Sequence, residues 1–222
     1  GDDALLAACR DCYASMFNDR AISYREAQGF DHMKVALSVG VQRMVRSDLA
    51  GAGVMFTIDT ESGYPDVTVI NAAWGLGESV VKGTVTPDEI TVYTPFLDRP
   101  GVVPVIGREL GSKQTKIVRG EGDTPTQTVE TTPAERAAFV LSDAEAVQLA
   151  RWGQAIERHY GIEMDIEWAR DGRTGELFIV QARPETVASK RVATSMKTYT
   201  LRGDGPVLAE GLAIGSAIAT GL

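Results

Sequence analysis

Two short segments late in the chain constrain its fold more than any other feature. In residues 164–169 polar and apolar side chains alternate, and residues 177–183 follow after a turn that contains two glycines. Alternation places every second side chain on the same face of a β-strand. The two segments therefore predict an antiparallel hairpin with one apolar and one polar face.

The polar face of this hairpin carries residue types suited to phosphate chemistry. Asp165 and Glu167 share one face of the first strand, and Gln181 and Arg183 share one face of the second. The two pairs converge if the strand register has the right parity. Carboxylate and amide oxygens suit Mg²⁺, and a guanidinium grips phosphate through paired donors. Any half-buried hairpin also exposes charges to water, so spacing alone leaves a binding site and an ordinary polar surface both open.

The rest of the chain reads as an α+β protein. Residues 4–18 have helical periodicity, residues 22–27 form a helical or extended piece, and residues 95–130 predict strands and long loops with little helix. A capping box from Ser142 to Glu145 starts the clearest helix, and Gly161 is placed to stop it. Strands are predicted at residues 35–39, 41–45, 53–58, 67–71 and 90–93.

Composition excludes several classes of function. The chain has 222 residues, 44% of them hydrophobic, and a net charge of -8 without any stripe of lysine and arginine. We therefore expect no nucleic acid partner. No apolar run approaches the roughly 20 residues of a membrane span, and no secretion signal is evident. We expect no membrane association and a cytoplasmic location.

Several conspicuous side chains have ordinary structural explanations. Cys9 and Cys12 form a C-x-x-C without partners for a zinc site, so we interpret them as neighbours on a helix. An isolated lysine is usually a solvated charge on the surface, and an arginine near acidic residues usually pairs with one of them. We expect solvated charges for Lys82, Lys113 and Lys116. Three arginines, Arg20, Arg25 and Arg46, either contact phosphate or, as we favour, pair with acids such as Asp19, Glu26 and Asp48.

Ordered motifs along residues 9–187 resemble the phosphoenolpyruvate synthase family. Several separate motifs in one order are far more specific than a single glycine pattern. The matching runs are residues 17–25, 41–50, 53–56, 59–63, 74–78, 87–89, 111–113, 165–168 and 181–186.

The resemblance implies an ATP-grasp fold, here chiefly its second half, with a mixed, largely antiparallel sheet and packed helices. It implies an enzyme, a phosphotransferase that uses Mg²⁺ with ATP to phosphorylate a histidine on a mobile domain. That family converts ATP, pyruvate and water to phosphoenolpyruvate, AMP and phosphate. The partners implied are ATP and the phosphohistidine domain and pyruvate-binding barrel of the same longer chain, and a homo-oligomeric parent stays open.

The resemblance also assigns roles to individual residues. Glu167 and Gln181 correspond to ligands of Mg²⁺ on the phosphate side, Arg183 to a phosphate contact that acts with Glu167 in catalysis, and Asp165 to a supporting carboxylate. Gln42 corresponds to a strand beside the adenine, with Met44 as an apolar wall. Ordinary strand packing explains those last two residues equally well. The glycine-spaced loop at 75–78 either brings backbone near phosphate or is simply a turn.

The resemblance divides the chain into four parts. Residues 1–30 are a helical segment that opens the ATP-binding domain, and residues 31–187 are the ATP-grasp subdomain. Residues 188–202 read as a linker, and residues 203–222 as the truncated start of the swivelling phosphohistidine domain. On this division the chain is an internal piece that does not complete the reaction alone.

Two other functions remain open at this point. A related phosphotransferase, similar to rifampin phosphotransferase, would keep the nucleotide chemistry and change the acceptor. A scaffold without catalysis would use this piece only to dock or position a swivelling domain. The combination of carboxylate, amide and guanidinium at 165–183 argues against a scaffold, which has no need of metal ligands.

Overall fold

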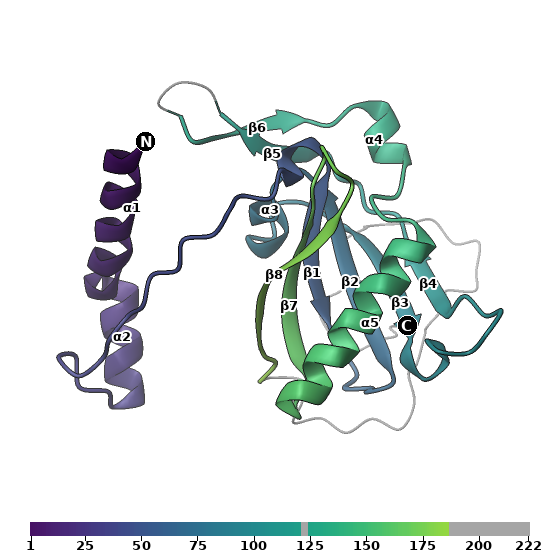
Figure 1. Ribbon diagram of the computed structural model, residues 1–222, viewed down its shortest axis with the longest axis horizontal. Coiled ribbons are helices and arrows are strands. Elements are labelled where there is room, and N and C mark those ends of the chain that lie inside the picture. The colour runs from purple at the N-terminus through teal and green to yellow at the C-terminus, as the bar shows by residue number, and fades with distance from the viewer. Residues whose placement is uncertain (121–123, 187–222) are drawn as a thin grey trace, which may run out of the picture. The chain divides into compact units, whose positions relative to one another are not determined.

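The computed structural model describes residues 1–120 and 124–186, which fall into two compact units (Figure 1). The first unit comprises residues 1–44, and the second begins at Val45. The predicted linker and the predicted start of a further domain lie outside the described residues. None of the described helices combines the length and the apolar character that a membrane span requires.

The first unit is helical, as its periodicity predicts. It contains α1 (Asp2–Ala14), the short 3-10 helix η1 (Ser15–Phe17) and α2 (Asp19–Gln28). The side chain of Asn18 accepts a hydrogen bond of 2.8 Å from the backbone N–H of Ala21 and so caps α2. Cys9 and Cys12 both lie on α1 as free thiols.

Arg25 is the buried residue of α2, and its partners differ from those expected. Its Nη2 donates to the carbonyl oxygen of Met16 at 2.6 Å, and its Nε donates to Nδ1 of His32 at 2.9 Å. The expected pair with Glu26 was wrong because adjacent side chains on a helix point in different directions. Arg25 instead ties α2 to the segments on either side of it.

The predicted strands at 35–39 and 41–45 do not form. Those residues have no regular secondary structure, and the side chains of Val41 and Met44 are 64% and 73% exposed. A strand needs a hydrogen-bonded neighbour and a face to bury, and no described strand pairs with this segment. Alternation alone therefore overestimated the sheet here.

The second unit is built on a six-stranded sheet of order β4-β3-β2-β1-β7-β8, in which every neighbouring pair is antiparallel. This confirms an α+β chain with a largely antiparallel sheet. A separate two-stranded ribbon joins β5 (Thr115–Arg119) and β6 (Thr126–Glu130). The strands of the main sheet are β1 (Gly51–Phe56), β2 (Val67–Trp74), β3 (Asp88–Tyr93), β4 (Val105–Glu109), β7 (Met164–Arg170) and β8 (Leu177–Pro184).

One face of the main sheet is covered by α5 (Asp143–Tyr160), which Figure 1 shows lying across the strands. The predicted capping box is present at Ser142, and the helix ends at Gly161 with a left-handed backbone. Leu149 and Ala150 of α5 are fully buried and belong to the same core cluster as Met55 and Ile166 of the sheet. This face is the hydrophobic core of the unit.

Short helical segments complete the second unit. Gly75 precedes α3 (Glu78–Val81), with a φ of 87° that favours glycine. The others are the 3-10 helices η2 (Ser47–Leu49) and η3 (Thr94–Phe96) and the helix α4 (Pro133–Ala137), which has a capping box of its own.

A β-bulge in the predicted hairpin decides which side chains face the core. Glu167 pairs with Gln181, but the next residue, Trp168, pairs with Ile179, so Val180 is an extra residue in β8. Ile179 therefore packs against the core with the buried Trp168. Gln181, two residues later, lies on the opposite face.

Candidate metal and phosphate site

The hairpin brings together the four polar residues predicted from its alternation. Asp165 of β7 stands directly opposite Arg183 of β8, and Glu167 stands directly opposite Gln181. Direct cross-strand partners have side chains close enough to interact. All four lie on the face of the sheet away from α5, because the residues between them, Ile166 in particular, point into the core.

Asp165 and Arg183 form an ion pair. Oδ2 of Asp165 accepts from Nε of Arg183 at 2.8 Å and lies 2.7 Å from Nη2. The side chain of Asp165 is only 13% exposed, whereas that of Arg183 is 65% exposed. Asp165 therefore holds one edge of the guanidinium, while Nη1 and the exposed side remain available to an anion.

Glu167 and Gln181 keep their hydrogen-bonding capacity for a ligand. Among the described residues, neither side chain has a hydrogen-bond or ion-pair partner. Mg²⁺ is commonly bound through one or two protein oxygens while phosphates and water complete its octahedron. The described residues contain no cluster of three or more histidine, cysteine or acidic side chains arranged for a metal. A carboxylate beside an amide carbonyl fits a cation that arrives with a phosphate ligand.

The polar row continues across the sheet beyond the hairpin. Val54 of β1 pairs with Glu167 on one side and with Asn71 of β2 on the other, and Asn71 pairs with Glu89 of β3. Cross-strand partners lie on the same face. A row of side chains that begins at Gln181 on β8 therefore runs over five strands and reaches Glu89 on β3.

The glycine-spaced loop at 75–78 approaches the face of the sheet that lies away from α5, which we call the open face. It contacts this face at Ala52, two residues before Val54 on β1. A Cβ added to Gly77 would lie 3.5 Å from Cβ of Ala52, so the backbone at Gly77 rests on this alanine. Ala52 pairs with Ala73 and Ala169, and all three alanines are buried. A row of small side chains thus lets the loop before α3 lie close to the sheet.

Glu89 at the far end of the row is an electrostatically unfavourable carboxylate. It pairs directly with Glu109 across β3 and β4. Desolvation by the surrounding protein raises the pKa of Glu89, and the negative charges of Glu109, Glu61 and Asp59 raise it further. This end of the row therefore disfavours an added anion without a cation.

Gln42 and Met44, predicted beside the adenine, belong to the first unit, whereas the hairpin belongs to the second. Both lie outside regular secondary structure and are exposed. The adenine contact predicted for Gln42 and Met44 therefore remains a proposal, separate from the site on the hairpin.

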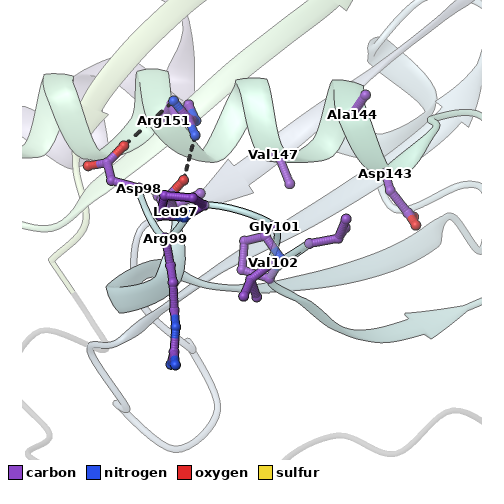
Figure 2. Close-up of a pocket in the computed structure, with 12 residues that line it drawn as sticks. Leu97, Asp98, Arg99, Gly101, Val102, Asp143, Ala144, Val147 and Arg151 are labelled. Atoms are coloured by element: carbon purple, nitrogen blue, oxygen red, sulfur yellow. Dashed lines mark hydrogen bonds and ion pairs between the residues drawn. The ribbon is translucent and has the colours of Figure 1, made fainter.

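A separate pocket lies along α5 on the core side of the sheet (Figure 2). Its volume is about 510 Å³. The loop from Leu97 to Pro104 forms one wall, and Val147 and Arg151 of α5 line the other. Arg151 lies 3.6 Å from Asp98 and also donates to the carbonyl oxygen of Leu97. Arg151 is already paired, Arg99 stacks on the ring of Phe96, and the lining is largely apolar, so this pocket is a poorer phosphate site than the hairpin.

The three lysines expected to be solvated are all paired. Lys113 is completely buried and bound to Asp88, so its expected exposure was wrong. Lys116 pairs with Glu135, and Lys82 pairs with Glu78 one helical turn away. No local pattern around Lys113 indicates burial, because its partner lies on a strand far away in sequence.

Comparison with known proteins identifies the family of the chain. Residues 1–202 match the model of the family described as pyruvate phosphate dikinase, AMP/ATP-binding domain. The chain is 54% identical over 224 residues to the phosphoenolpyruvate synthase of Synechocystis sp., with 98% of this chain and 27% of that protein covered. It is 54% identical to the enzyme of the same name from Escherichia coli and 53% identical to that from Pseudomonas aeruginosa, with all of this chain and 28% of each relative covered.

These relatives carry the name of one enzyme, and the chain spans a little over a quarter of their length. The family match covers most of the chain, including the hairpin with its polar face. The chain therefore belongs to the pyruvate phosphate dikinase AMP/ATP-binding domain family.

Proposed function

We propose that this chain forms the metal- and phosphate-binding edge of an Mg-ATP site with an ATP-grasp fold. The observation that carries the proposal is the register of the hairpin, which pairs Glu167 with Gln181 and Asp165 with Arg183 on one face. Two neutral or negative oxygen ligands beside an exposed guanidinium match a metal-bound polyphosphate. The family match supports a nucleotide as the ligand.

Each side chain has a distinct task in this site. Glu167 and Gln181 would hold Mg²⁺, which when bound supplies positive charge beside the phosphate oxygens. Arg183 binds a phosphate through the part of its guanidinium that Asp165 leaves free. Asp165 fixes the orientation of that guanidinium. The N–H donors of Arg183 are therefore already in place when negative charge develops on the phosphate oxygens during phosphoryl transfer.

The complete protein, on this proposal, is a dikinase of the phosphoenolpyruvate synthase type. It would use ATP to phosphorylate a histidine on a mobile domain and convert pyruvate and water with ATP to phosphoenolpyruvate, AMP and phosphate. The names of the relatives support pyruvate as the acceptor over the rifampin alternative. We place the enzyme in the cytoplasm, with the phosphohistidine domain and the pyruvate-binding barrel as its partners in the same protein.

The test uses the full-length protein that contains this chain. Glu167→Gln and Arg183→Met should each reduce ATP-dependent formation of phosphohistidine at least about 100-fold, as expected when a charge-stabilising group is removed. Glu176→Gln and Arg173→Met change the same residue types in the exposed turn of the same hairpin and should retain activity. Unfolding in urea should show that all four variants stay folded.

The outcome that contradicts the proposal is equally specific. If Glu167→Gln and Arg183→Met both form phosphohistidine at the wild-type rate, the site is misassigned. A scaffold without nucleotide chemistry would show no heat of binding with Mg-ATP in calorimetry of the unaltered protein.

A further inference from the structure

Asn71 occupies the position on the open face that complements Glu167. Val54 lies between them, paired with Glu167 on one side and with Asn71 on the other. Neighbouring strands are about 4.8 Å apart, so the two Cα atoms are separated by about 10 Å. Both side chains rise from the sheet in the same direction, with the side chain of Val54 between them.

Asn71 lies in a partly exposed stretch of this face. Along β2 the buried Ala73, the cross-strand partner of the Ala52 that contacts Gly77, lies on one side of Asn71, and the buried Val67 lies on the other. Between those covered ends, Val69 and Asn71 are only half-buried, and so is Val54 on the next strand. A bounded strip with an apolar floor and polar edges is typical of small-molecule sites.

The amide of Asn71 is unused within the described part of the chain. No hydrogen bond to its side chain is formed by residues 1–120 or 124–186. An asparagine amide offers two N–H donors and an acceptor oxygen. The amide atoms of this half-buried side chain are not among the buried polar atoms that lack a partner, so they can reach solvent or a ligand.

We propose that Asn71 is a further ligand-binding residue of the site and contacts the phosphate–metal group across Val54 from Glu167. The inference rests on the proposed function and names an additional residue for it. The ligand class is a nucleoside triphosphate with a divalent cation. An amide suits this place because its N–H groups can donate to phosphate oxygens, whereas a carboxylate there would add to the negative charge of Glu89 and repel the phosphate.

Calorimetric titration of the full-length protein with Mg-ATP tests this inference. Asn71→Ala should weaken Mg-ATP binding about tenfold, the effect of losing one hydrogen bond to a charged group. Asn71→Asp has nearly the same shape and should weaken binding more strongly, since it loses the donors and adds repulsion. Gln148→Ala removes an exposed amide from α5, on the other side of the sheet, and should bind as the wild type does.

The controls separate this inference from the proposed function. If Glu167→Gln weakens Mg-ATP binding but both Asn71 variants bind as the wild type does, the role of Asn71 is overturned and the site stands. If the unaltered protein does not bind Mg-ATP, the proposed function itself fails. If both Asn71 variants lose binding only together with a large drop in their urea midpoint, Asn71 is structural, and the inference is again overturned.

Discussion

Asp88 of β3 and Lys113 of the loop before β5 form an ion pair in which neither side chain has any exposed surface. The same carboxylate accepts from the backbone N–H groups of Gly111 at 2.9 Å and Val140 at 2.8 Å. Lys113 also donates to the carbonyl oxygen of Gly111. Buried charges persist only with several such partners, and here those partners hold the backbone at Gly111 and Val140 beside β3.

Removing one member of this pair should destabilise the second unit strongly. Lys113→Met leaves Asp88 charged and without its cation, which should cost about 3–5 kcal/mol of unfolding free energy. Adding Asp88→Asn removes that charge, and the double variant should be more stable than Lys113→Met alone. Urea unfolding can be followed by the fluorescence of Trp74, Trp152 and Trp168, all of which lie in this unit.

The matched control is Lys116→Met, which breaks the partly exposed pair with Glu135. Its cost should be no more than about 1 kcal/mol. Equal costs for Lys113→Met and Lys116→Met would show that burial of the Asp88 pair does not matter energetically.

The pair of Arg46 and Asp48 should make stability depend on acid pH. Two hydrogen bonds of 2.8 Å and 2.7 Å join Nε and Nη2 of Arg46 to the carboxylate. They lower the pKa of Asp48, against the opposing effect of desolvation. The stabilisation is therefore full above the unfolded-state pKa of about 3.9 and is lost as the pH falls through the lower folded-state pKa.

Unfolding of the wild type and Asp48→Asn from about pH 6 to about pH 3 measures this dependence. The difference in unfolding free energy should be constant at the upper end and shrink at the lower end. Asp98→Asn, at a position where the side chain is 89% exposed, should show no such trend. A difference that stays constant across the whole range would contradict the assignment.

The ionised form of Glu89 should destabilise the fold, in contrast to that of Asp48. Its pKa is raised in the folded protein by desolvation and by neighbouring acids, so ionisation destabilises the fold. Glu89→Gln should stabilise the protein at neutral pH by about 0.2–1 kcal/mol, the scale of a cross-strand pair of like charges. The gain should vanish below the unfolded-state pKa of about 4.3, where the wild-type carboxyl is also neutral. A destabilised Glu89→Gln variant at neutral pH would refute this account.

Gly75 should tolerate no side chain. Its φ is 87°, and an added Cβ would lie 2.4 Å from the carbonyl oxygen of Ile117. That oxygen accepts from the N–H of Leu76 at 2.8 Å, so it cannot move away without loss. Gly75→Ala should cost about 1–3 kcal/mol and displace the loop that lies on Ala52.

Gly83→Ala separates strain from steric clash in this comparison. Gly83 also has a positive φ, of 64°, but nothing lies within 4 Å of its added Cβ. It should cost only the strain of the left-handed conformation, about 1–2 kcal/mol. If Gly83→Ala destabilises the protein as much as Gly75→Ala does, contact with Ile117 is not the cause.

Elements with strong local signals could be predicted from the sequence. The capping box at Ser142 and the glycine at 161 mark the ends of α5 because both act within one helical turn. The hairpin of β7 and β8 follows from alternation and a short turn for the same reason. Residues 35–45 show the limit of this approach, since a strand pattern has no effect without a neighbouring strand.

The residue types of the candidate site on the hairpin could be predicted from the sequence, but the residues that other strands add to the same face could not. Alternation placed Glu167 and Gln181 on one face of each strand, and the structure supplies the register that pairs them. Asn71 was missed because it reaches the same face through a different strand, and only sheet order brings it there. The burial of Lys113 was missed for a similar reason, as its partner Asp88 is 25 residues away.

The extra residue in β8 allows one strand to meet two separate demands. Ile179 and Gln181 have the same parity and would share a face in a regular strand, but Val180 puts them on opposite sides. The half of β8 before the bulge thus anchors the strand in the core, and the half after it displays polar groups. Substitutions on the displaying half can alter ligand chemistry without disturbing the anchor, and a single-residue deletion at 180 would make Ile179 and Gln181 neighbours on opposite faces, which removes the bulge but keeps both surfaces.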